Sequence, residues 1–94
     1  MSNAEISWNG LGPDGRKRQV NVRREAGTWV FRSREKRFDD WNVDEAPPLE
    51  DWLELLDGIR RRIGRGLLKT EEERNVTLEI RRRFPQAEIP RSGA

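Results

Sequence analysis

Apolar residues recur at helical spacing in one stretch of the chain, from Pro48 to Ile63. Steps of three and four residues place six of them on one helical stripe: Leu49, Trp52, Leu53, Leu56, Ile59 and Ile63. Pro48 suits the first turn of a helix, and Gly64 suits a left-handed residue just beyond its end. Gly58 is expected to point away from the stripe. The pattern therefore predicts a helix over 48–63 with one buried face.

A second, shorter helix is predicted after the glycines at 64 and 66. Thr70 and Glu73 have the spacing of a capping box, in which each side chain caps a backbone N–H of the first turn. A narrow apolar stripe follows, at Val76, Ile80 and Phe84. Pro85 ends the predicted helix, and residues 86–94 are expected to form a frayed tail.

Alternating apolar and polar residues predict a β-hairpin in the first forty residues. Its strands span 18–24 and 28–34, and Glu25 to Gly27 form the turn. The residues expected to face inward are Val20, Val22, Trp29 and Phe31. A similar alternation at Glu5–Asn9 leaves open a third strand.

These elements predict an α+β fold, with a two- or three-stranded antiparallel meander followed by two α-helices packed on one face of it. The segment 38–46 has no period and is expected to be an irregular crossover pinned by Phe38 and Trp41. A chain of 94 residues has room for one modest core. We therefore expect one domain over 1–94, with an ordered part of about 5–84.

Charge is unevenly distributed although the net charge is only +2. Residues 1–37 hold nine basic and four acidic side chains, whereas residues 38–57 hold eight acidic and no basic ones. One interpretation is that the acidic crossover folds beside the basic hairpin and neutralises it within the molecule. The other is that a basic sheet face remains free for a polyanion or an acidic partner.

The residue types argue against an enzyme. The chain has no His, Cys or Tyr, so the usual general bases, thiol nucleophiles and imidazole metal ligands are missing. Asp40, Asn42 and Asp44 have the first three spacings of a calcium loop, but Glu45 stands where such a loop needs glycine. We therefore expect no catalytic residue, no cofactor and no dedicated metal site.

The polar face of the hairpin is the candidate site. It carries amide and guanidinium side chains suited to base edges and phosphates, and a two-stranded ribbon can enter a DNA major groove. The residues that would contact a nucleic acid or an acidic partner are Lys17, Gln19, Asn21, Arg23, Arg32 and Arg34. The sequence thus favours a small binding domain that contacts nucleic acid through this face.

The alternative function is a protein-interaction or self-associating module that pairs acidic with basic patches between chains. The four Trp residues are expected in the core, at positions 8, 29, 41 and 52, although exposed tryptophans could instead stack on bases. No apolar run is long enough to span a membrane, and without cysteine the chain suits a reducing compartment. A cytoplasmic location is expected.

Overall fold

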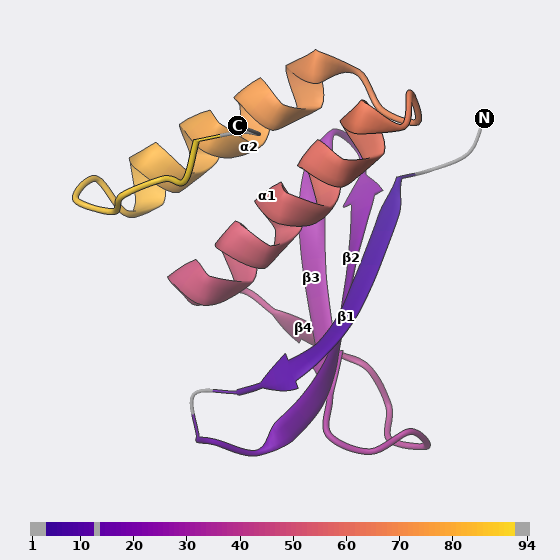
Figure 1. Ribbon diagram of the computed structural model, residues 1–94. Coiled ribbons are helices and arrows are strands. Elements are labelled where there is room, and N and C mark those ends of the chain that lie inside the picture. The colour runs from indigo at the N-terminus through magenta and orange to yellow at the C-terminus, as the bar shows by residue number, and fades with distance from the viewer. Residues whose placement is uncertain (1–3, 13, 92–94) are drawn as a thin grey trace. The chain divides into compact units, whose positions relative to one another are not determined.

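The structure is a computed structural model that describes residues 4–12 and 14–91. Its elements are β1 (Glu5–Leu11), β2 (Lys17–Glu25), β3 (Thr28–Arg34), β4 (Asn42–Asp44), α1 (Leu49–Gly64) and α2 (Thr70–Arg83). The strands belong to one compact unit, which ends at Ala46, and the helices to a second, which begins at Pro47. We call them the sheet unit and the helix unit. The α+β class, an antiparallel meander followed by two helices, is confirmed (Figure 1).

The sheet unit is a four-stranded antiparallel sheet in the order β1-β2-β3-β4 (Figure 1). The predicted hairpin is present, with Val22 paired to Phe31, and the third strand forms as β1. One face of the sheet is buried, through Ile6, Val20, Val22 and Phe31. Trp29 shares that parity but is only half-buried. The alternation therefore assigned the two faces correctly.

The segment before α1 differs from the prediction in two ways. Residues 42–44 form β4, which extends the sheet by pairing Val43 with Arg32. Phe38 is 93% exposed and Trp41 is 39% exposed, so neither residue pins the crossover to a core. A strand of three residues is too short to produce a visible alternation, because its pairing is decided by β3 beside it.

Helix α1 begins after Pro48 and buries a face that is rotated from the predicted one. Trp52, Leu56 and Ile59 are buried as expected, but Leu55 and Gly58 are buried too. The prediction that Gly58 points away from the buried face is therefore wrong. Leu53 and Ile63 are only half-buried, and both line a cavity of the helix unit.

The end of α1 is capped by Gly66, not by Gly64 as predicted. Gly64 is the last helical residue, and Gly66 takes the left-handed conformation with φ 75°. Leu67 N donates to Arg62 O at 2.8 Å and Gly66 N donates to Ile63 O at 2.9 Å. These two bonds form a Schellman motif, which needs a positive φ at the residue following the cap.

Helix α2 lies beside α1 in the helix unit and buries Val76 and Ile80 (Figure 1). The predicted capping box does not form, since Thr70 is already helical and no side chain caps the helix. Glu73 accepts a hydrogen bond from Arg60 of α1 at 2.9 Å instead. Lateral pairing with a second helix has thus taken the carboxylate that the cap would have used.

Residues 84–91 continue without regular secondary structure, and Ala87 N donates to Phe84 O at 3.0 Å. The last part of the predicted tail, 92–94, lies outside the described residues. Neither helix of the described chain is long and apolar enough to cross a membrane.

Candidate functional site

The six predicted site residues share one face of the sheet, opposite the buried one. Strand register and alternation define this polar face, to which all four strands contribute. Its members are Glu5, Ser7, Asn9, Leu11, Lys17, Gln19, Asn21, Arg23, Glu25, Thr28, Val30, Arg32, Arg34 and Val43. Four of these side chains are cationic and two are carboxylates, so the polar face has a net charge of +2.

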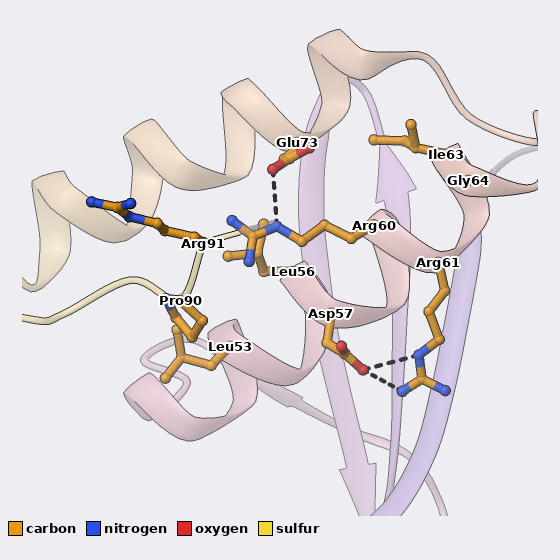
Figure 2. Close-up of a pocket in the computed structure, with 10 residues that line it drawn as sticks. All are labelled: Leu53, Leu56, Asp57, Arg60, Arg61, Ile63, Gly64, Glu73, Pro90 and Arg91. Carbon is orange, nitrogen blue, oxygen red and sulfur yellow. Dashed lines mark hydrogen bonds and ion pairs between the residues drawn. The ribbon is translucent and has the colours of Figure 1, made fainter. Parts of the chain in front are cut away.

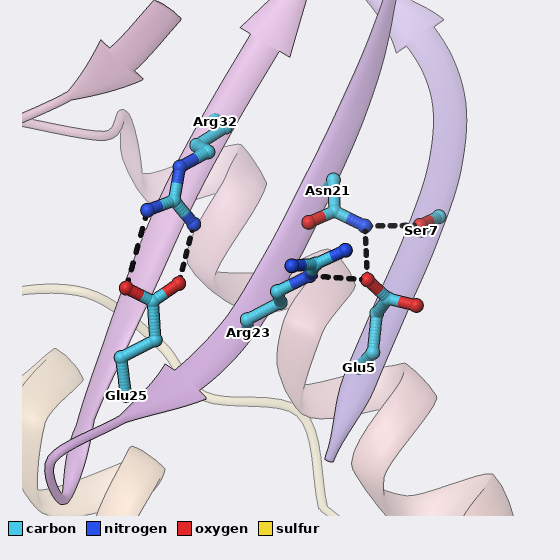
Figure 3. A network of polar contacts seen from close by, with 6 residues as sticks. All are labelled: Glu5, Ser7, Asn21, Arg23, Glu25 and Arg32. Atoms are coloured by element: carbon cyan, nitrogen blue, oxygen red, sulfur yellow. Dashed lines mark hydrogen bonds and ion pairs between the residues drawn. The ribbon is translucent and has the colours of Figure 1, made fainter. Parts of the chain in front are cut away.

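Glu5 of β1 occupies one edge of the polar face and neutralises Arg23 (Figure 3). Arg23 Nε donates to Glu5 Oε2 at 2.5 Å, and Asn21 Nδ2 donates to the same oxygen at 3.1 Å. Asn21 also donates to Ser7 Oγ at 2.9 Å. Hydrogen bonds from Asn21 and then from Arg23 lower the pKa of Glu5. Two of the predicted site residues, Asn21 and Arg23, are therefore already bonded to side chains of β1.

Arg32 of β3 is neutralised in the same way, by a carboxylate of β2. Its two terminal nitrogens donate to the two carboxylate oxygens of Glu25 at 2.5 and 3.1 Å, a bidentate pair (Figure 3). This pairing lowers the pKa of Glu25 and raises the pKa of Arg32. Planar bidentate geometry is the strongest form of guanidinium–carboxylate bond. Arg32 is thus the least available cation of the polar face.

Arg34 differs from these two arginines because no carboxylate neutralises it in the described chain. Its Nε donates to the neutral amide oxygen of Gln19 at 2.7 Å, across the β2–β3 register. Its guanidinium carbon lies 4.2 Å from the ring centroid of Trp41, which is a cation–π contact. Arg34 is therefore oriented by neutral groups, and no carboxylate of the described chain offsets its charge.

A hollow lies beside Gln19, where β1 ends and β2 begins. It encloses about 460 Å³ and is lined in part by Asn9, Lys17, Gln19 and Glu35. Lys17 makes no ion pair within the described residues, so its ammonium is the second unneutralised cation of the polar face. Lys17, Gln19, Arg34 and Trp41 consequently form one continuous track, which we call the stacking track.

The carboxylates of the crossover do not neutralise the site arginines. Asp39, Asp40, Asp44 and Glu45 make no ion pair among the described residues. Asp39 instead accepts a hydrogen bond from the backbone N–H of Lys36 at 3.0 Å. The carboxylates that pair with Arg23 and Arg32 belong to β1 and β2, so the interpretation in which the crossover neutralises the hairpin does not hold for these two arginines.

The helix unit contains a second cavity, of about 510 Å³ (Figure 2). Leu53, Leu56 and Ile63 supply apolar walls, and Pro90 and Arg91 of the carboxyl-terminal segment close one side (Figure 2). Most of its charges already have partners, since Arg60 pairs with Glu73 and Arg61 pairs with Asp57. None of the predicted site residues lines this cavity.

Trp41 is the one member of the stacking track that the sequence did not assign to the site. Its position, two residues before Val43, places it on the polar side of β4 and so beside Arg34. That signal is invisible without knowing that β4 exists. Within the described residues no cluster of three or more carboxylates could hold a metal ion.

Comparison with known proteins gives no indication of a family for this chain. No protein-family model, no curated protein and no solved structure matches this chain.

Proposed function

We propose that this chain is a non-enzymatic binding domain that contacts nucleic acid through the polar face of its sheet. The observation that carries the proposal is the stacking track, in which two unneutralised cations, an amide and an exposed indole follow one another. Cations bind phosphates, amides pair with base edges, and aromatic rings stack on bases. One continuous surface thus offers all three kinds of contact.

Size and charge support the same assignment. The open hollow of about 460 Å³ beside Lys17 and Gln19 falls in the size range of small-ligand sites. The net charge of +2 on the polar face attracts a polyanion only weakly, so modest affinity and a shallow salt dependence are expected. The proposed location is the cytoplasm, because a chain without cysteine needs no disulfide and suits a reducing compartment.

The test titrates labelled single-stranded RNA and duplex DNA with wild type and with Lys17→Gln/Arg34→Gln at about 50 mM salt. Each lost phosphate contact flattens the slope of log affinity against log salt by about 0.7 for a single strand. The double variant should therefore bind more weakly, with a slope reduced by up to about 1.4. The fold should survive, because both side chains point away from the buried face.

The matched control is Arg74→Gln/Arg81→Gln in α2, which removes the same charge from exposed residues of the other unit. It should bind as tightly as wild type. A wild type without saturable binding to either nucleic acid would contradict the proposal. Equal losses in the two double variants would reduce the effect to net charge alone.

A second candidate function is association with a basic protein surface, including another copy of this chain. It is favoured by the four crossover carboxylates, which have no ion-pair partner in the described structure: Asp39, Asp40, Asp44 and Glu45. Charge-paired association weakens as salt rises. Sedimentation at low and high salt should reveal an oligomer that dissociates as salt rises. A monomer at both salt concentrations would rule out self-association of this kind.

A further inference from the structure

From the geometry of the polar face we infer that its ligand is a single strand, with an unstacked base seated on Trp41. This inference rests on the proposed function and specifies its substrate. It replaces the expectation that the hairpin enters a duplex groove. Three features carry it: the width of the sheet, the exposure of Trp41 and the lack of a carboxylate partner for Arg34 among the described residues.

The width of the sheet opposes groove binding. Strands β2 and β3 are the two central strands, since β1 and β4 are bonded to their outer edges. Neighbouring strands lie about 4.8 Å apart, so the axes of β1 and β4 are separated by about 14 Å. A major groove about 12 Å wide admits a two-stranded ribbon. The broad, open face instead suits a splayed single strand.

Trp41 provides the surface on which a base can stack. One side of its ring lies against the Arg34 guanidinium, with 4.2 Å between cation and ring centroid, and 39% of the residue remains exposed. A base inside a duplex already stacks on its neighbours, whereas a base of a single strand is free to stack on an aromatic ring. Stacking contacts of this kind tolerate any base. Sequence preference should therefore be weak.

Arg34 adds charge at the point of stacking. Its partners are a neutral amide, Gln19 Oε1 at 2.7 Å, and the backbone oxygen of Asp39 at 3.5 Å. A phosphate next to the stacked base can approach this guanidinium without displacing a carboxylate. At Arg23 or Arg32 it would first have to break a bond of 2.5 Å to Glu5 or Glu25. The track around Trp41 is thus the most accessible anion site of the polar face.

The experiment compares an unstructured single-stranded RNA with a duplex of the same sequence, using wild type, Trp41→Ala and Trp41→Phe. Wild type should bind the single strand more tightly than the duplex, because only the single strand offers an unstacked base. Loss of one stacked base costs about tenfold to hundredfold in affinity, so Trp41→Ala should weaken single-strand binding by that factor. Trp41→Phe retains a ring and should recover most of the loss.

Salt dependence separates stacking from charge. Trp41→Ala removes no charge, so its salt slope should equal that of wild type, whereas Arg34→Gln should flatten the slope by about 0.7. Leu78→Ala, which removes an exposed apolar residue of α2, should change neither quantity. A melting curve for each variant confirms that it is folded.

The remaining outcomes distinguish failure of the single-strand inference from failure of the proposed function. Equal or tighter binding of the duplex, or unchanged affinity in folded Trp41→Ala, would overturn the single-strand inference and leave the proposed function standing. Absence of binding to both nucleic acids in wild type would overturn the proposed function and this inference together.

Discussion

Two residues of the β2–β3 turn have positive φ angles, Ala26 at 52° and Gly27 at 80°. They are the two central residues of a tight hairpin, because Glu25 is the register partner of Thr28. Such turns match the twist of the flanking strands only when both central residues are left-handed. Glycine takes this conformation without strain, whereas alanine does not. Ala26 is therefore a strained residue at a position that sets the register of the polar face.

Replacing Ala26 by Asn should relieve part of this strain. Asn tolerates the left-handed region, so Ala26→Asn should raise the free energy of unfolding by about 0.5–1 kcal/mol. Gly27→Ala provides the opposite case, since a methyl group there meets no atom within 4 Å and only backbone strain is added. It should lower stability by about 1 kcal/mol. Urea unfolding measures both, and a neutral or destabilising Ala26→Asn would argue against the left-handed assignment.

Glu25 links the polar face to pH. Hydrogen bonds from Arg32 lower its pKa from the ordinary value of 4.5. A carboxyl whose pKa is lower in the folded state stabilises the fold at pH values above its pKa in the unfolded state. This stabilisation is lost as the pH falls through its pKa in the folded state. Glu25→Gln cannot ionise. The difference in Tm between wild type and Glu25→Gln should therefore be present at neutral pH and shrink below pH 4.5.

Glu88→Gln is the control for this pH experiment, because Glu88 is exposed and has no ion pair in the described chain. Its Tm should follow that of wild type throughout. A difference between wild type and Glu25→Gln that does not change with pH would show that the Arg32 pairing contributes nothing that ionisation controls.

At the scale of elements, the two helices share one electrical arrangement. Acidic residues occupy the first turn of each helix and arginines occupy the last turn: Glu50, Asp51, Arg61 and Arg62 in α1, and Glu71, Glu72, Glu73, Arg81, Arg82 and Arg83 in α2. This order complements the helix dipole. Arg83 also lies 5.1 Å from the ring centroid of Trp52. The arginine triplets therefore have structural roles that require no ligand.

The glycines at the end of α1 give a matched pair of substitutions. Gly66 has a φ of 75° in the Schellman motif, so Gly66→Ala should lower stability by about 1 kcal/mol. Gly64 is helical and an added methyl group meets no atom within 4 Å, so Gly64→Ala should raise stability by about 0.5–1 kcal/mol. Thermal or urea unfolding of the two variants decides which glycine caps the helix. If Gly64→Ala lowered stability more than Gly66→Ala, Gly66 would not be the left-handed residue that caps α1.

At the scale of the whole molecule, stability depends on few large side chains. The buried apolar residues number ten among those the structure describes, and Trp52 is the largest of them. Replacing a buried Trp by Ala costs about 3–5 kcal/mol, while small proteins are stable by about 5–15 kcal/mol. Trp52→Ala should therefore be largely unfolded or melt far below wild type. A melt within a few degrees of wild type, followed by circular dichroism, would contradict the role of Trp52 in the core.

The sequence by itself determined the features that depend on local chemistry. Turn residues and alternation placed Val20, Val22 and Phe31 on one face and the six candidate residues on the other, because side chains in a strand alternate strictly. Helical periodicity and Pro85 located both helices to within a residue or two, because residues three and four apart share one face of a helix and proline cannot continue it. These signals are carried by residues only a few positions apart.

Tertiary structure alone decided how these elements use their side chains. Glu5 reaches Arg23, and Glu73 gives up a cap for Arg60, through contacts between residues 18 and 13 positions apart. Strand β4 exists because β3 offers it hydrogen bonds, and its pairing puts Trp41 beside Arg34. Each charged or aromatic group has several possible partners far away in the sequence, and the local pattern does not show which of them it contacts in the fold. The stacking track is therefore a product of the folded sheet, because it joins residues from three different segments of the chain.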